Sequence, residues 1–259
     1  MSNIIKELYT YREMIYNLVH RDLRGRYKGS FLGFAWTFIN PLLQLAVYTM
    51  VFSLIMRNGI KDYYLFLFVA LIPWIFLSSC ISSGAGCIRA QGNMIKKIYF
   101  PREAIPLSFV IGQFINMLLS LVVVFAVLII SGKGLSISAL VYLPLIMIIE
   151  FLIALGLTFL ISGITVFFRD IEYFAGIIVM AWQFATPVMY GLDMVPERLV
   201  PFFKLNPMTP VIVAYRDILY YKQAPELSTL ISAVIFGVIL FALGVFSFNK
   251  LKKHFVEEL

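Results

Sequence analysis

Few side chains in this sequence could carry out acid–base or nucleophilic chemistry. Glu150 is the one ionisable residue deep inside a long apolar run, and the two histidines, His20 and His254, lie near the ends of the chain. The sequence contains no Gly-x-x-x-x-Gly-Lys phosphate loop, no His-Glu-x-x-His zinc motif and no nucleophile elbow. We therefore expect no catalytic residues and no metal site, and we expect the chain to bind or move a substrate rather than transform it.

Glu150 has two interpretations that the sequence leaves open. A charge in hydrocarbon is costly unless it is paired, neutralised or wetted. The carboxyl group either faces a polar pathway, or it is protonated and hydrogen-bonded between helices. No second acidic or basic residue accompanies it in its run, as a proton relay would require.

Aromatic residues form 16% of the chain. Tyr63, Tyr64 and Trp74 suit anchoring positions at a membrane surface. Four others lie away from the simplest anchoring positions, and aromatic faces stack well on sugar rings. We predict that these four line a carbohydrate path: Trp36, Tyr48, Trp182 and Tyr190.

The elements that would position these residues follow from composition. With 61% hydrophobic and 14% charged residues, the chain has too little polar surface for a water-facing globule. A bilayer core of about 30 Å needs roughly 20 apolar residues per helix, and continuous apolar runs without alternation exclude a barrel. The sequence predicts an all-α integral membrane protein with six transmembrane helices, at 29–56, 63–88, 104–132, 134–168, 173–192 and 227–249.

Charge predicts the orientation of these spans. Two thirds of the 21 Lys and Arg residues precede the first span, lie between spans two and three or four and five, or follow the sixth. By the positive-inside rule, both termini are cytoplasmic. The net charge of +7 then reflects orientation, and because no basic face with interleaved aromatics lies outside the spans, we expect no nucleic-acid partner. We also expect no cleaved secretory signal at the start of the chain.

The segments outside the spans carry apolar patterns of their own. Residues 1–28 form a predicted amphipathic helix in the membrane interface. Its apolar stripe comprises Ile4, Leu8, Tyr11, Ile15 and Leu18.

The cytoplasmic loop 89–103 is short and basic, yet it holds Ile95, Ile98, Tyr99 and Phe100. We expect these side chains to be exposed and to need a covering partner, although packing against the lipid interface is an alternative.

The outer segment 193–226 contains five prolines and two apolar stretches, Leu199–Phe203 and Val211–Tyr215, that are too short to cross. We predict two short re-entrant helices that form a lid or vestibule at the outer mouth. The two cysteines, Cys80 and Cys87, would lie about 10 Å apart on one helix, which is too far for a disulfide.

Several of these segments resemble the permease subunits of polysaccharide ABC exporters, the family that moves O-antigen, capsule or teichoic acid precursors. The matching segments occur in the same order along essentially the whole chain. They are Arg21-Asp22-Leu23, Arg26-Tyr27, Ser30, Leu32-Gly33, Trp36 and Pro41, then Met94 to Arg102, Phe168 to Ile171, Pro187 to Tyr190, Val195-Pro196-Glu197 and Leu205 to Met208.

The resemblance implies a single transmembrane domain over residues 1–259 in the bacterial cytoplasmic membrane. It implies a homodimer with two copies of a separate ATPase, which would bind ATP and Mg, and a lipid-linked glycan as substrate. This chain would hold no cofactor. Contacts with the ATPase are implied for Met94, Ile95, Lys96, Lys97, Tyr99, Phe100, Arg169 and Asp170.

Two other functions fit the sequence less well. A drug or lipid ABC exporter permease would share the spans without needing the aromatic lining. A structural membrane-assembly subunit would have neither a pathway nor an ATPase partner.

Overall fold

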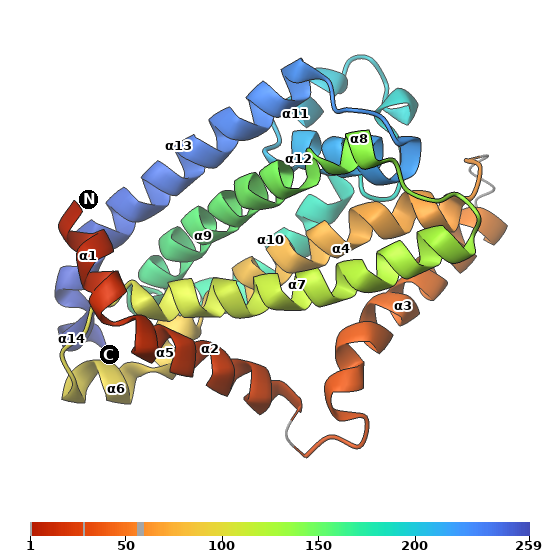
Figure 1. Cartoon of the computed structure of the whole chain (residues 1–259). Helices are drawn as coiled ribbons and strands as arrows, with labels where there is room; N and C mark the ends of the chain where they lie inside the picture. Colours follow the sequence, from red (N-terminus) through yellow and green to blue (C-terminus); the bar gives the residue numbers. More distant parts are fainter. Residues whose placement is uncertain (1, 28, 56–59) are drawn as a thin grey trace.

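The structure is a computed structural model that describes residues 2–27, 29–55 and 60–259, including their side chains except at 2–5, 26–27 and 53–55. Within these ranges every regular element is a helix, as predicted. Long helices run side by side, and both termini lie at the same end of the bundle (Figure 1). The side chain of the predicted stripe residue Ile4 and the predicted span boundary Met56 lie outside the described part of the chain.

Five helices are long and apolar enough to cross a bilayer. The first is Gly33–Phe52, in which the short helix η1 (Gly33–Ala35) leads into α3 (Trp36–Thr49) and the π-helix η2 (Met50–Ile55). The others are α4 (Tyr63–Ser82), α7 (Ala104–Ile130), the pair α8 (Ile137–Leu140) and α9 (Leu143–Phe167), and α13 (Leu227–Leu251) with its extension through η5 (Lys252–His254) and α14 (Phe255–Glu258).

The predicted fifth span is shorter than expected. The helix α10 (Ile171–Phe184) has 14 residues, or about 21 Å, against a bilayer core of about 30 Å. It ends where the side chain of Asn206 donates a hydrogen bond of 2.9 Å to the Ala185 carbonyl. Pro187 follows, and a proline cannot extend a helix. Helix length therefore confirms five of the six predicted spans.

The predicted second span also ends early. The helix α4 stops at Ser82, six residues before the expected boundary, and a separate short helix, α5 (Cys87–Ala90), follows. A Cβ at Gly84 would collide with the Cys80 carbonyl, so the chain turns there only because that residue is glycine. Cys80 and Cys87 are both buried and are not joined by a disulfide, as predicted.

The centre of the bundle is α4. It packs against α3, α7, α9, α10 and α12 (Met208–Arg216). Because α4 is apolar on every side, burial on every side is its stable arrangement. It holds the other elements in place.

Two glycines bring α9 and α13 into backbone contact. A Cβ at Gly156 would collide with the Leu240 carbonyl, and a Cβ at Gly244 with the Gly156 carbonyl. Small residues at a crossing let two membrane helices approach closely, which increases their van der Waals contact. These two long helices form the most extensive pair in the described fold.

The N-terminal segment forms two helices, α1 (Ser2–Thr10) and α2 (Arg12–Tyr27). The predicted stripe faces inward: Leu18 is buried, and Leu8, Tyr11 and Ile15 pack on the core of the same chain. The helix α2 lies along α7, where a Cβ at Gly112 would lie 3.0 Å from Asp22. The apolar stripe is thus covered by the rest of the same chain.

The outer segment contains the two short helices that the sequence predicted. They are α11 (Val200–Lys204) and α12, preceded by η3 (Leu192–Met194) and followed by the π-helix η4 (Asp217–Tyr221). Whereas α12 is buried almost throughout, no residue of α11 is buried. At the opposite end of the bundle, α6 (Gly92–Lys97) lies near the two termini (Figure 1).

Candidate functional site

One candidate site is the end of the bundle that carries both termini, here called the terminal face: α6, residues 98–102, residues 168–170 and α14. Polar contacts hold its parts together. Arg89 pairs with Glu172 at 3.0 Å, and Lys252 pairs with Glu103. The rings of Phe167 and Phe255 are tilted against each other, with centroids 6.3 Å apart. The chain therefore presents this face as one surface.

Of the four apolar residues predicted to be exposed on this face, two are exposed and two are buried. Ile95 and Phe100 are each only 2% exposed, because they belong to the chain's own core. Ile98 is 58% exposed and Tyr99 is 81% exposed. Ile95 lies on the side of α6 that covers the bundle, whereas Ile98 has extended backbone geometry after the helix ends at Lys97. Only Ile98 and Tyr99 remain for a partner.

The remaining residues predicted to contact the ATPase surround this pair. Lys96, Lys97, Arg169 and Asp170 are exposed, and Met94 is half-buried. Arg169 and Asp170 lie in the turn between α9 and α10. The Arg89–Glu172 pair connects that turn to the segment that leads into α6. The terminal face thus presents exposed apolar side chains, Ile98, Tyr99, Phe168 and Val256, among charged ones.

The other end of the bundle is built around Arg216, a residue that the sequence analysis counted only as a charge. Its guanidinium is buried and donates to the carbonyls of Val188 at 2.6 Å and Tyr190 at 3.0 Å. It also lies 3.7 Å from the centroid of the Phe66 ring. Because an arginine stays charged in proteins, these acceptors replace its hydration. Arg216 thereby joins α12, α4 and the segment after α10.

Glu150, on α9, is fully buried, and Tyr215 of α12 donates a hydrogen bond of 2.6 Å to its Oε2. Its other oxygen has no partner among the described residues. This geometry matches the second interpretation of Glu150, a carboxyl group hydrogen-bonded between helices. The residues adjacent in sequence, Tyr215 and Arg216, thus fix α12 to α9 and α4 respectively.

Asn206 organises the end of α10. Besides the Ala185 carbonyl, it contacts the Thr186 hydroxyl at 2.8 Å and accepts a hydrogen bond of 2.9 Å from the indole of Trp182. The Tyr190 hydroxyl donates to the Phe184 carbonyl, and its ring lies 6.1 Å from that of Phe203. Trp182 and Tyr190, two of the predicted lining residues, therefore make contacts that hold the outer segment.

The other two predicted lining residues lie on α3. The Trp36 indole donates to the Ser30 hydroxyl at 3.0 Å, and Trp36 lines a cavity between α3, α4 and α7. Tyr48 is half-buried and packs on the core. The four aromatic residues thus lie in two regions, Trp36 and Tyr48 on α3, and Trp182 and Tyr190 at and after the end of α10.

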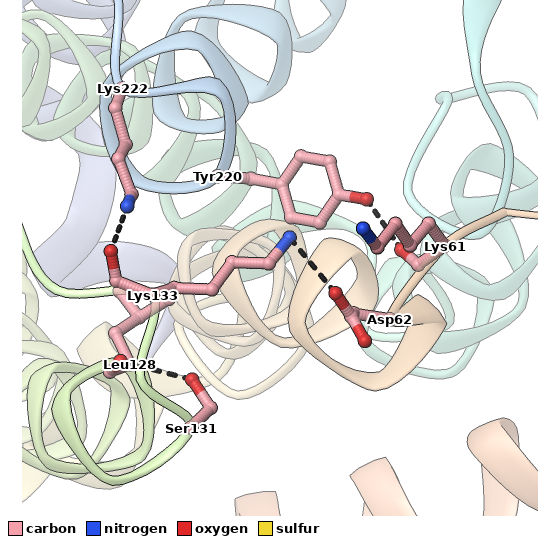
Figure 2. A network of polar contacts seen from close by, with 7 residues as sticks. All are labelled: Lys61, Asp62, Leu128, Ser131, Lys133, Tyr220 and Lys222. Carbon is pink, nitrogen blue, oxygen red and sulfur yellow. Dashed lines mark hydrogen bonds and ion pairs between the residues drawn. The ribbon is translucent and has the colours of Figure 1, made fainter.

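Three loops meet at the end opposite the terminal face, in an arrangement here called the loop clamp: residues 61–62, 131–134 and 220–222. Lys133 pairs with Asp62 at 3.2 Å, Lys222 donates to the Lys133 carbonyl, and Tyr220 donates to the Lys61 carbonyl (Figure 2). Lys133 also lies 4.2 Å from the centroid of the Tyr220 ring. The clamp joins α4, α7 and η4.

Several residues of the loop clamp have backbone conformations with positive φ. Asp62 and Lys222 have φ values of 48° and 61°, which are uncommon for residues with a Cβ. Gly132 and Gly134, on either side of Lys133, also have positive φ values, of 73° and 67°.

In the neighbouring η4, burial raises the pKa of Asp217, whose carboxylate accepts a hydrogen bond of 3.2 Å from Gln223.

Comparison with known proteins identifies the family. Residues 13–220 match the ABC-2 type transporter family, which covers more than half of the chain. The chain belongs to the ABC-2 type transporter family. It is a multi-pass membrane protein of a transport system, in agreement with its apolar helices.

Relatives of this ABC-2 chain extend along its whole length. It is 32% identical over 261 residues to an O-antigen export system permease protein of Myxococcus xanthus, with 100% of each chain covered. It is 34% identical over 246 residues to an O-antigen export system permease protein of Klebsiella pneumoniae, covering 95% of this chain and 94% of the relative. A polysialic acid transport protein of Escherichia coli is 25% identical over 207 residues, with 76% of this chain and 77% of the relative covered.

Proposed function

We propose that this chain is the membrane subunit of an ATP-driven exporter that moves a lipid-linked polysaccharide across the bacterial cytoplasmic membrane. The observation that carries the proposal is the full-length similarity to an O-antigen export permease, at 32% identity with both chains covered completely. The two alternatives suggested by the sequence, a drug or lipid exporter and an assembly subunit, have no comparable support.

The working unit is a homodimer with two copies of a separate ATPase, which binds ATP and Mg. Both termini face the cytoplasm, so the terminal face meets the ATPase. In this orientation α10 and the chain up to Leu192 complete a sixth crossing. The helices α11 and α12 enter the outer leaflet without crossing it and form the outer gate.

The apolar exposure of α3 and α10 supports a second copy of the chain as their partner. Leu43 and Val47 on α3, and Ile177, Ile178 and Phe184 on α10, are all more than half exposed. Each helix uses its other side to pack on α4. Two copies joined along these helices would enclose a path between them, with Trp36 of α3 at its wall.

The terminal face supports docking to the ATPase. Ile98 and Tyr99 are the large exposed apolar side chains of its α6 region, and Lys96, Lys97 and Arg169 give the surrounding rim a positive charge. A buried apolar centre with a polar rim is the usual composition of a protein interface. ATP-driven movement of the ATPases would reach the spans through this contact.

The double variant Ile98→Ala with Tyr99→Ala tests the docking. Because both side chains are exposed, the permease should keep its own stability while losing co-purification with the ATPase and export of surface glycan. The matched control is Tyr221→Ala, a tyrosine of similar character that is 56% exposed at the other end. Normal capture of the ATPase by the double variant would refute the docking assignment.

The function itself is tested in a strain from which the gene is deleted. Restored surface polysaccharide on re-expression of the chain with its ATPase supports the proposal. If polysaccharide export is unaffected by the deletion while a small hydrophobic compound accumulates in the cells, the proposed substrate class is wrong.

A further inference from the structure

A cavity of about 120 Å³ lies at the mid-height of three candidate spans. Its wall includes Pro41 of α3, Ile72 of α4 and Met117 of α7, each near the middle residue of its span. The middle of a bilayer is where an uncompensated polar group is most costly. The cavity would therefore be expected to have an apolar lining.

The lining is instead rich in uncharged polar side chains. Trp36 and Asn40 contribute from α3, Ser79 from α4, and Gln113, Asn116 and Ser120 from α7. Among the described residues around the cavity, none carries a charge. This combination of amides, hydroxyls and an indole N–H suits a neutral ligand and gives no counter-charge to an ion.

Some of these groups have a structural explanation. Pro41 lacks the N–H that would bond to the Thr37 carbonyl in a regular helix. The Ser120 hydroxyl reaches that carbonyl from α7 at 3.4 Å and also lies 2.9 Å from the Asn116 carbonyl. Hydroxyl groups commonly compensate a proline in a membrane helix in this way. Ser120 therefore holds α3 and α7 together.

Asn116 has no such explanation. Its side-chain oxygen is buried, and in the described part of the chain it has no hydrogen-bond partner. A buried amide that served only to join helices would be paired, because leaving an acceptor unpaired costs more than the bond contributes. On α3, Asn40 lines the cavity, is exposed and accepts a hydrogen bond of 3.2 Å from Gln44, so the cavity reaches the surface of the chain at Asn40.

We propose that this cavity binds uncharged hydroxyl groups and that its ligand is a sugar unit of the glycan during passage. The Asn116 oxygen accepts a hydrogen bond from a sugar hydroxyl, the Asn40 amide contacts a second one, and the Trp36 ring covers the apolar face of the sugar. The choice of a sugar as ligand rests on the proposed function above. The cavity is larger than one water molecule requires, and its opening at Asn40 lets a longer chain slide past.

The first test is photo-cross-linking in the complete transporter during glycan export. A diazirine-bearing leucine analogue replaces Asn116, and in a second variant it replaces Leu118, which lies two residues away on the exposed side of α7. Glycan attached to the permease at position 116 but not at 118 supports the proposal. Equal labelling at both positions, or no labelling at 116 while export proceeds, overturns it.

The second test compares Asn116→Leu with Asn116→Ser. Leucine has a similar size but no acceptor, so export should slow about fivefold, the loss of one hydrogen bond to the moving substrate. Serine keeps an acceptor and should restore part of the rate, with equal ATPase co-purification in both variants. Export by Asn116→Leu at the wild-type rate overturns the proposal.

The proposed function and the sugar site can be refuted independently of each other. If the wild-type complex exports no glycan, the proposed function is wrong and the cavity loses its ligand. If the wild type exports glycan and the variants and cross-links show no effect at position 116, only the sugar site is wrong.

Discussion

The helices on one side of the bundle, here called the packed side, are mostly buried within the chain, whereas those on the other, here called the open side, are mostly exposed. On the packed side, formed by α4, α9 and α12, 78% of the span in α4 is buried. On the open side, formed by α3 and α10, only 17% of the first span is buried, and α10 buries two residues, Ala175 and Val179. Hydrophobicity alone does not distinguish the two kinds of helix, because the span that contains α13 has a mean hydropathy of 2.6 and is only 17% buried, whereas α4 has a mean hydropathy of 2.3 and is 78% buried.

Polar residues divide less sharply between the two sides. On the packed side, Tyr215 and Arg216 find partners within the chain, whereas one oxygen of Glu150 has none among the described residues. Beside the open side, the Ser120 hydroxyl is paired and the Asn116 oxygen is not. We infer that an unpaired buried group serves binding only where a cavity adjoins it, as at Asn116.

The largest expected effect comes from Leu71→Ala in α4. Leu71 is 0% exposed, so truncation leaves a cavity and should lower the free energy of unfolding by about 3 kcal/mol. Its matched control is Leu43→Ala on α3, where the side chain is 54% exposed within one chain and the same change should cost the single chain almost nothing. Denaturation with sodium dodecyl sulfate in mixed micelles measures both. Equal losses would erase the distinction between the two sides.

Arg216→Met should have the next largest effect. It removes the charged donor from the Val188 and Tyr190 carbonyls and should cost about 2 kcal/mol. Arg198→Met is the control, since Arg198 is exposed in the same outer segment. Limited proteolysis of the segment after α10 provides a local readout. Unchanged protection there in the Arg216 variant would show that other contacts hold the segment.

Substitution of Glu150 should have a smaller effect that depends on the replacement. Glu150→Leu leaves the Tyr215 hydroxyl without its acceptor and should cost about 1 kcal/mol, the usual size of an interhelical hydrogen bond in membranes. Glu150→Gln keeps an acceptor and should leave both stability and export unchanged. Loss of export by a stable Glu150→Gln protein would instead restore the polar-pathway interpretation.

Trp182→Phe should give the smallest measurable loss, about 0.5–1 kcal/mol for one hydrogen bond to Asn206. The ring contact with Trp74, at 6.1 Å between centroids, would be largely kept. Because α10 has few buried contacts, the loss should appear as faster proteolysis near Ala185 rather than as global unfolding. A large drop in global stability would place α10 on the packed side.

Sequence patterns predicted the class of the fold well but not the ends of its helices. Long apolar runs located α4, α7, α9 and α13 because bilayer thickness sets a minimum length. The early end of α10 depends on Asn206, which lies 21 residues away from Ala185, and no local pattern reveals a contact of that kind.

The candidate sites, too, were predicted only in part. The α6 region was correctly predicted to leave Tyr99 exposed, but a run of apolar residues did not tell which ones the bundle covers, so Ile95 and Phe100 were assigned wrongly. Arg216 was missed because a cation at the end of a short predicted helix gives no sign of being buried. The roles assigned to Trp36 and the terminal-face residues stay predictions.

The contact between Gly156 and Gly244 has a mechanical consequence. Around these two glycines the backbones of α9 and α13 touch, with no side chain between them to change its rotamer and absorb movement. We therefore expect the pair to behave as one stiff rod that reaches from the end near Phe255 to the end near Leu227. A displacement applied at one membrane surface would then reappear at the other almost undiminished.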